Sequence, residues 1–198
     1  MFKTILTEMA MVIFFTLNMC THASAASPFA TDVLSELMRI QEDDTYIGNA
    51  GRLYVPECGY SVALYEIPES GAGAQKAVDA EDSAALLCNY GPQRVVADHT
   101  HQGFGNVLRA CDYGTVVYLK TAEGVWPYIF LSKDPDSRNG GDIVWDSHGN
   151  SIYGYDDNGL TFYTCNEDWR HVTTAHFIQY TAAQKAETEN WQKTEGGS

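Results

Sequence analysis

"LTFYTCNEDWRHV", residues 160–172, is the stretch from which both the fold and a candidate site can be inferred. Inward- and outward-type residues alternate from Leu160 to Cys165, which is the two-residue period of a β-strand. The strand ends on a cysteine, a short polar loop follows, and Arg170 opens a second strand. If the loop reverses the chain, the two strands are antiparallel and Arg170 returns close to Cys165.

A cysteine at a strand end is held rigidly yet stays accessible, which suits an attacking thiol. A thiol has a reference pKa of about 8.5, so a nucleophilic Cys165 needs a neighbouring base or positive charge. "VVADHTHQGF", residues 95–104, supplies His99 at the end of another apolar strand, with His101 two positions later. Pairing of the two strands would bring His99 to Cys165, and Arg170 would hold a substrate carbonyl and stabilise its oxyanion. The pattern predicts an acyl-transfer site.

The rest of the chain favours a mainly β fold. Short runs rich in Val, Tyr and Leu are bounded by Gly, Pro, Asp or Asn, and they predict strands at 51–58, 60–67, 93–99, 114–121, 125–132, 142–145, 159–165 and 171–180. Apolar spacing predicts an amphipathic helix over 28–43 and a helical turn over 104–111. Residues 68–75 are expected to form a loop and 77–87 a short helix. Many short strands with little helix indicate an antiparallel barrel or sandwich.

The ends of the chain differ from its middle. Lys3, an apolar stretch from Met9 to Leu17 and the small-residue site Ala23-Ser24-Ala25 predict a secretion signal over 1–25, cleaved after Ala25. A retained membrane anchor is the alternative. We expect an N-terminal helical segment at 26–50, the β domain at 51–181 and a polar tail at 182–198.

Charge and cysteine content restrict the classes of function that the protein could have. The formal net charge of −14 argues against nucleic acid, whose phosphates need Lys and Arg. Export would place the chain where disulfides persist. Four cysteines follow the signal: Cys58, Cys88, Cys111 and Cys165. If all pair, no thiol is left for chemistry; if Cys165 is free, one disulfide at most forms, and its pairing among the other three stays open.

The motifs together resemble those of the sortases, cysteine transpeptidases of Gram-positive cell envelopes. The matching pieces, in family order, read "GRLYVPECGYSVALYE", "VVADH", "FGNVL", "CDYGTVVYL", "LTFYTC" and "WRHVTTAHF", and they cover roughly residues 51–180. The resemblance implies a sortase-like closed β-barrel of about eight strands, with an N-terminal helix and short peripheral helices. It also implies a protein that is secreted or held at the cell envelope.

The resemblance assigns roles to individual residues. His99 matches the family's histidine, Cys165 its nucleophile, Arg170 its arginine, and Thr164 the residue that helps to shape the substrate site. The implied reaction cleaves a sorting-type peptide of a secreted or surface protein through a thioacyl-enzyme, then transfers the acyl group to an amine of cell-wall precursor or pilin type. No cofactor or metal is implied, and we expect a monomer. Asp98 departs from the family pattern, which commonly has Gly there, and the loop before Arg170 is short.

Three other readings of the same residues stay open. Water in place of the amine would make the protein a cysteine protease. A Cys165 tied into a disulfide would favour a non-catalytic β-barrel that binds envelope ligands. His99 and His101 share one strand face and would suit a metal, but His171 and His176 are five apart and should point to opposite faces, which leaves no convincing third ligand.

Overall fold

The structure, a computed structural model, describes residues 28–68, 72–87, 94–100, 103–140, 143–154, 158–165 and 171–180. The expected signal at 1–25 and the tail at 182–198 lie outside this part. The chain divides into two units after Ser35, within the helix α2 (Pro28–Glu42). Within the second unit, the Lys120 ammonium donates to the carbonyls of Ile40 and Gln41 in the last turn of α2.

The second unit is built mainly from strands, as expected. They are β1 (Gly51–Val55), β2 (Tyr60–Ile67), β3 (Ser83–Leu87), β4 (Arg94–Ala97), β5 (Val116–Thr121), β6 (Gly124–Asn139), β7 (Val144–Trp145), β8 (Gly159–Cys165) and β9 (His171–Gln179). Three short helical segments join them: η2 (Pro56–Cys58), α3 (Ala72–Val78) and α4 (Phe104–Ala110). Every helix in the described part of the chain is too short or too polar to cross a lipid bilayer.

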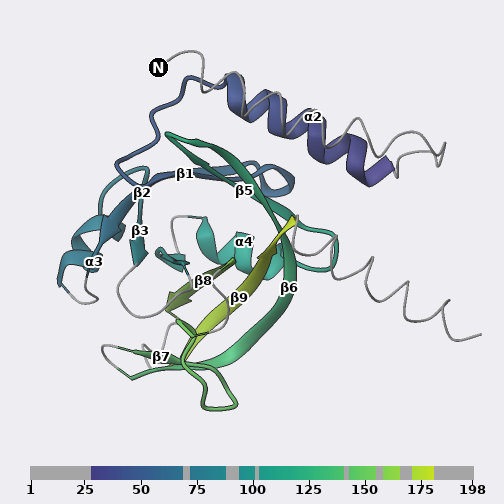
Figure 1. Cartoon of the computed structure of the whole chain (residues 1–198). Coiled ribbons are helices and arrows are strands. Elements are labelled where there is room, and N and C mark those ends of the chain that lie inside the picture. Colours follow the sequence, from purple (N-terminus) through teal and green to yellow (C-terminus); the bar gives the residue numbers. More distant parts are fainter. Residues whose placement is uncertain are drawn as a thin grey trace, which may run out of the picture. The chain divides into compact units, whose positions relative to one another are not determined.

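The strands close into a barrel. Their order is β5-β1-β2-β3-β4-β8-β9-β6, and β6 pairs back onto β5, so eight strands complete the ring while β7 extends it from β6. Figure 1 shows α4 inside the outline of the ring and α3 outside it, beside β2 and β3. The sequence-based prediction of a closed, mainly β barrel with short peripheral helices is therefore confirmed. It is not purely antiparallel, because β2–β3 and β4–β8 are parallel pairs.

The helix predicted over 77–87 is wrong in its second half. Residues 83–87 form β3, which is buried along its whole length because its two faces contact different clusters of apolar residues. A strand buried on both faces shows no alternation of polar and apolar residues, so its period cannot separate it from a helix. The helix α3 begins earlier, inside the segment 68–75 that was expected to be a loop.

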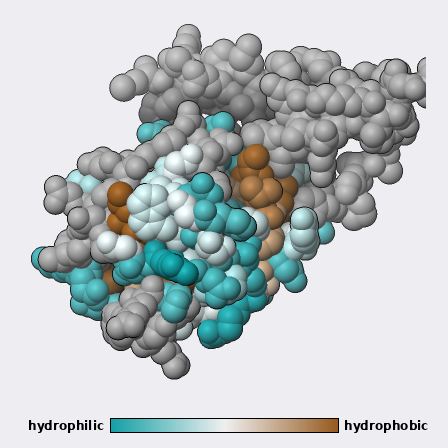
Figure 2. Space-filling model, turned by 90° about the horizontal axis from the view of Figure 1, so that it is seen from below, coloured by the Kyte–Doolittle hydropathy of each residue, from teal (hydrophilic) through white to brown (hydrophobic). Residues whose placement is uncertain are grey.

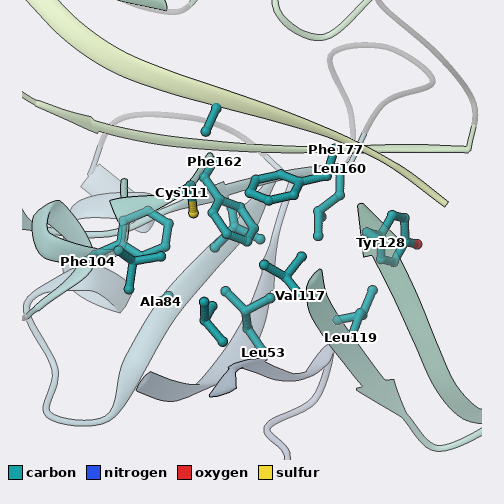
Figure 3. Close-up of a cluster of buried hydrophobic side chains, with 14 of the residues drawn as sticks. Leu53, Ala84, Phe104, Cys111, Val117, Leu119, Tyr128, Leu160, Phe162 and Phe177 are labelled. Carbon is teal, nitrogen blue, oxygen red and sulfur yellow. The ribbon is translucent and has the colours of Figure 1, made fainter. Parts of the chain in front are cut away.

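The barrel interior is an aromatic-rich core, shown in Figure 3. The ring of Phe162 lies 4.5 Å from that of Phe177 and 5.2 Å from that of Phe104, measured between centroids. Phe104 and Leu108, on the helical turn expected over 104–111, are both buried there. The core fixes β8 against α4 and β9, and thereby holds the end of β8 in place.

A second apolar cluster, here called the outer cluster, lies on the other face of the same wall. Its members come from α3, β3, β4, β7, β9 and the segment after β7: Ala74, Val78, Ala85, Leu87, Val95, Ala97, Val144, Ile152, Tyr153 and Val172. The exposed surface is different in character. On the face in Figure 2, hydrophilic residues dominate and hydrophobic ones form separate small patches, in keeping with the acidic composition.

Candidate active site at the ends of β4 and β8

The parallel pairing of β4 with β8 sets the position of the candidate site. Ala97 lies opposite Tyr163, and the Asp98 N–H donates to the Tyr163 carbonyl at 3.4 Å, so the pairing continues past β4. His99 and Cys165 each follow the Ala97–Tyr163 pair by two residues. The two strands therefore bring His99 and Cys165 to the same end of the barrel wall, the arrangement expected from the sequence.

Cys165 continues the outward-facing row of β8, and His99 follows the end of β4. Ala97 belongs to the outer cluster, and Tyr163 and Cys165 pack against it, half-buried. The imidazole of His99 contacts Asp79 directly after α3, a helix whose residues belong to the same outer cluster. The candidate site is therefore on the outside of the barrel wall, not in the aromatic core.

Thr100 ties the loop after β4 to the end of β8. Its hydroxyl donates to the carbonyl of Cys165 at 2.7 Å and lies 2.9 Å from the hydroxyl of Thr164. Since the Thr100 proton goes to the carbonyl, Thr164 is the donor in the second bond. Thr164, expected to shape the substrate site, is buried, and its hydroxyl is hydrogen-bonded to that of Thr100.

Asp98 stands where the sortase pattern commonly has Gly, and its carboxylate makes two hydrogen bonds that a glycine could not. It is buried; one carboxylate oxygen accepts the His99 backbone N–H and the other accepts the Tyr60 hydroxyl, each at 2.7 Å. Burial, together with the neighbouring Asp98 carboxylate, raises the pKa of Tyr60 well above its ordinary value, so the phenol stays a donor. The carboxylate thus links the backbone at His99 to the side chain of Tyr60.

Sequence reasoning missed the side chain that contacts the imidazole of His99. Asp79, just after α3, has a carboxylate oxygen 2.7 Å from Nε2 of His99. The amide of Gln75 donates to that oxygen at 2.8 Å and lies 3.1 Å from the same imidazole nitrogen. The Gln75–Asp79 spacing of one helical turn was a usable signal, but the mistaken helix over 77–87 placed Asp79 inside an element and not at its end.

Cys165 is a free thiol, as are Cys58 and Cys111, the other cysteines within the described residues. Burial raises the pKa of Cys165 above its ordinary value, because the thiolate is less well solvated than in water. In this arrangement the thiol is mostly protonated at neutral pH, so only a small fraction is ready to attack.

A glycine in α4 permits the close approach that supports this site. A Cβ atom added at Gly105 would lie 2.5 Å from Cγ2 of Thr100 and 3.0 Å from its carbonyl oxygen. Real Cβ atoms essentially never come as close as the first of these distances. The helix α4 can therefore approach Thr100 this closely only because residue 105 has no side chain.

The predicted site residue Arg170 lies outside the described residues, as do His101, whose role was left open, and Cys88. The expected reversal of the chain is confirmed, since β8 and β9 are antiparallel with Cys165 opposite Val172. His171 is exposed and His176 is buried, in agreement with their expected opposite faces.

A pocket of about 430 Å³ lies elsewhere, near the start of β2. It is lined by Glu36, Arg39, Asp43, Tyr54, Pro56, Gly59, Tyr60 and Ser61. It touches the site only through Tyr60, whose hydroxyl binds Asp98.

Comparison with solved structures supports a sortase-type fold for the eight-stranded barrel. Sortase E1 from Streptomyces coelicolor matches with a TM-score of 0.51 and 15% identity, over 65% of this chain and 85% of that one. Sortase A of Listeria monocytogenes matches at 0.49 and 14%, over 66% and 86% of the two chains. A pilus-related sortase C of Group B Streptococcus matches at 0.48 and 16%, over 71% and 70%. The chain has the sortase fold.

The likeness is structural only. Comparison of the sequence with family models and with curated proteins finds no match. The fold is therefore shared, while the chemistry must be argued from the site itself.

Proposed function

We propose that this protein is an exported sortase-type cysteine transpeptidase. The observation that supports the proposal is the parallel pairing of β4 with β8, because His99 and Cys165 each stand two residues beyond the last pair. A rigid strand end, a thiol and an imidazole are the parts that covalent acyl transfer requires. Sortase E1 of Streptomyces coelicolor, which shares the fold, was solved with a tripeptide in its active site.

The proposed reaction has two steps. The Cys165 thiolate attacks a peptide carbonyl of a secreted or surface protein, and the protonated His99 gives its proton to the leaving amine, so that a thioacyl-enzyme forms. His99 then takes a proton from an incoming amine of cell-wall precursor or pilin type, which attacks the thioester and frees Cys165. Arg170 is proposed to stabilise the oxyanion formed in each step, and Thr164 to shape the substrate site through its bond to Thr100.

Asp79 is proposed as the residue that orients His99. Its oxygen lies 2.7 Å from Nε2 of the imidazole, so an Nε2–H donates to the carboxylate and the ring is held in one orientation. In the serine-protease triad, replacing the carboxylate partner of the histidine by its amide lowers kcat by about 10⁴-fold. Because the Asp79 side chain is 58% exposed, we expect Asp79→Asn to lower kcat by a smaller factor and to leave the thermal midpoint unchanged. Glu81→Gln, a nearby exposed acid, is the matched control.

The proposal is tested by trapping the thioacyl-enzyme. The purified protein is incubated with a defined peptide library and hydroxylamine, and peptide hydroxamates are identified by mass spectrometry. We expect hydroxamates from the wild type and from Cys58→Ala, and none from Cys165→Ala or His99→Ala. Cleaved peptides without hydroxamate would instead identify a protease that uses water.

A non-catalytic binding module is the second candidate. The observation that favours it is the raised pKa of Cys165, which disfavours the reactive thiolate. Absence of any peptide product, together with alkylation of Cys165 no faster than that of Cys58, would support this candidate and reject the enzyme.

A further inference from the structure

Cys58 and Cys111 come together at one corner of the barrel interior. Cys58 ends η2, Cys111 follows α4 directly, and η2 and α4 pack against each other. Cys111 is buried in the aromatic core, and Cys58 is partly buried against the same core. Figure 3 shows the Cys111 sulfur in this cluster, near Phe104 and Phe162.

Hydrogen bonds fasten the residues next to the two cysteines. The Thr115 hydroxyl donates to the carboxylate of Glu57 at 3.1 Å, and the same hydroxyl accepts the Asp112 backbone N–H at 3.2 Å. Glu57 precedes Cys58 and Asp112 follows Cys111. Thr115 therefore links the residue before Cys58 to the residue after Cys111.

The pKa of Cys111 responds to its surroundings, Cys58 included. Burial, followed by the effect of a Cys58 thiolate, raises the pKa of Cys111 to about 12. The effect of Cys58 exceeds that of Lys133, although the Lys133 ammonium binds the Cys111 carbonyl at 3.0 Å. The geometric basis for pairing the two cysteines is the packing of η2 against α4 and the contact of both residues with one core.

Cys165 is separated from this pair by the barrel wall. It packs against the outer cluster, whereas Cys58 and Cys111 contact the inner core. A disulfide needs Cα atoms within about 7 Å and Cβ vectors that face each other. The position of Cys165 does not suit either partner, so it stays available for chemistry.

We infer that Cys58 and Cys111 form a disulfide that ties η2 to the end of α4 when the protein meets a disulfide-bearing oxidant, such as oxidised glutathione or a thiol–disulfide oxidoreductase. The thiolate of Cys58, the more exposed partner, attacks the oxidant disulfide and releases one thiolate. Cys111, deprotonated, then attacks the Cys58 sulfur and expels the second. Two protein thiols are oxidised and one oxidant disulfide is reduced to two thiols. The crosslink closes a long loop, which constrains the unfolded chain.

The test is a disulfide map of the full protein after incubation with oxidised glutathione. Digestion without reductant, followed by mass spectrometry, should give one linked pair of peptides, containing Cys58 and Cys111, while Cys165 is recovered alkylated. The wild type should unfold at a higher temperature oxidised than reduced, and this difference should vanish in Cys58→Ser and in Cys111→Ala. A link to Cys88, or full alkylation of both cysteines after oxidation, would overturn the inference.

This result is independent of the proposed enzyme activity. The disulfide is detected by mass and by the thermal difference, neither of which requires Cys165 to react. A wild-type comparison of oxidised with reduced protein needs no variant, so the test holds even if Cys111→Ala folds poorly.

Discussion

The side chains on the two faces of β8 have different roles, although they alternate along one strand. Leu160 and Phe162 point into the barrel, are fully buried and pack in the aromatic core. Tyr163 and Cys165 point outward, stay partly exposed and lie on the face that carries the candidate site. The inward residues hold the strand still, and the outward cysteine is thereby positioned without being enclosed. Substitutions on one face or the other should therefore affect stability and activity separately, which tests the comparison.

Removal of the outward thiol should have the largest effect on activity. Cys165→Ala is expected to lower acyl transfer by at least about 10³-fold, because no covalent intermediate can form. The same variant should change the free energy of unfolding by less than about 1 kcal/mol, because the side chain is only half-buried. Hydroxamate yield and urea unfolding measure the two quantities. A Cys165→Ala protein that unfolds early would show that the outward face also supports the fold.

Removal of an inward ring should have the opposite profile. Phe162→Ala is expected to lower the free energy of unfolding by about 3–5 kcal/mol, the usual cost of emptying a large buried aromatic site. Phe162 is fully buried, and its ring packs against that of Phe177 at an interplanar angle of 44°. Urea denaturation of wild type, Phe162→Ala and Phe162→Leu gives the measurement. If Phe162→Ala were no less stable than Tyr163→Ala, the distinction between the two faces would fail.

Gly105→Ala should affect both the stability of the fold and the reactivity of Cys165. The new methyl group meets Thr100 and must displace it, which is expected to cost about 1–3 kcal/mol of stability. Because Thr100 binds the carbonyl of Cys165, the end of β8 should also loosen. We expect a changed rate of Cys165 alkylation by iodoacetamide. Gly154→Ala, whose new Cβ would meet only the carbonyl oxygen of Ser151 at an ordinary contact distance of 3.7 Å, is the control for crowding.

The pH dependence of alkylation should report the half-buried state of Cys165. Its pKa is raised by burial, so the rate of alkylation should climb to a midpoint above the reference value of about 8.5. The profile is measured with iodoacetamide on the Cys58→Ala, Cys111→Ala protein by following the Cys165 peptide. A midpoint well below the reference value would mean that a positive charge outweighs burial at this site.

The smallest expected effect concerns stability at mildly acidic pH. His176 is buried, its Nδ1 lies 2.8 Å from the Thr161 hydroxyl, and burial lowers its pKa below the ordinary value. In the unfolded chain the pKa is about 6.5, so below that pH the unfolded state binds more protons and stability falls toward the lower folded pKa. Urea unfolding at pH 7.5 and 5.5 should show a loss that shrinks in His176→Asn. An equal loss in the variant would assign it to other groups.

Much of the fold could be predicted because its signals are local. The alternation in residues 160–165 and the Phe104–Leu108 turn depend on neighbours in sequence, and both appear in the structure as expected. The error at 77–87 arose where local patterns fail, in a strand buried on both faces. The same error hid Asp79, whose contact with His99 joins residues that are far apart in the chain.

The sequence by itself determined that a cysteine ends one strand and a histidine follows another, because period, turn residues and motif order are written along the chain. The tertiary structure alone decided that those strands are parallel neighbours and that Thr100 and Asp98 fix the loop between the two residues. It also placed Cys58 with Cys111 and apart from Cys165. The physical reason is that strand order and the two faces of a closed wall are set by packing among distant segments, and no local pattern encodes that choice.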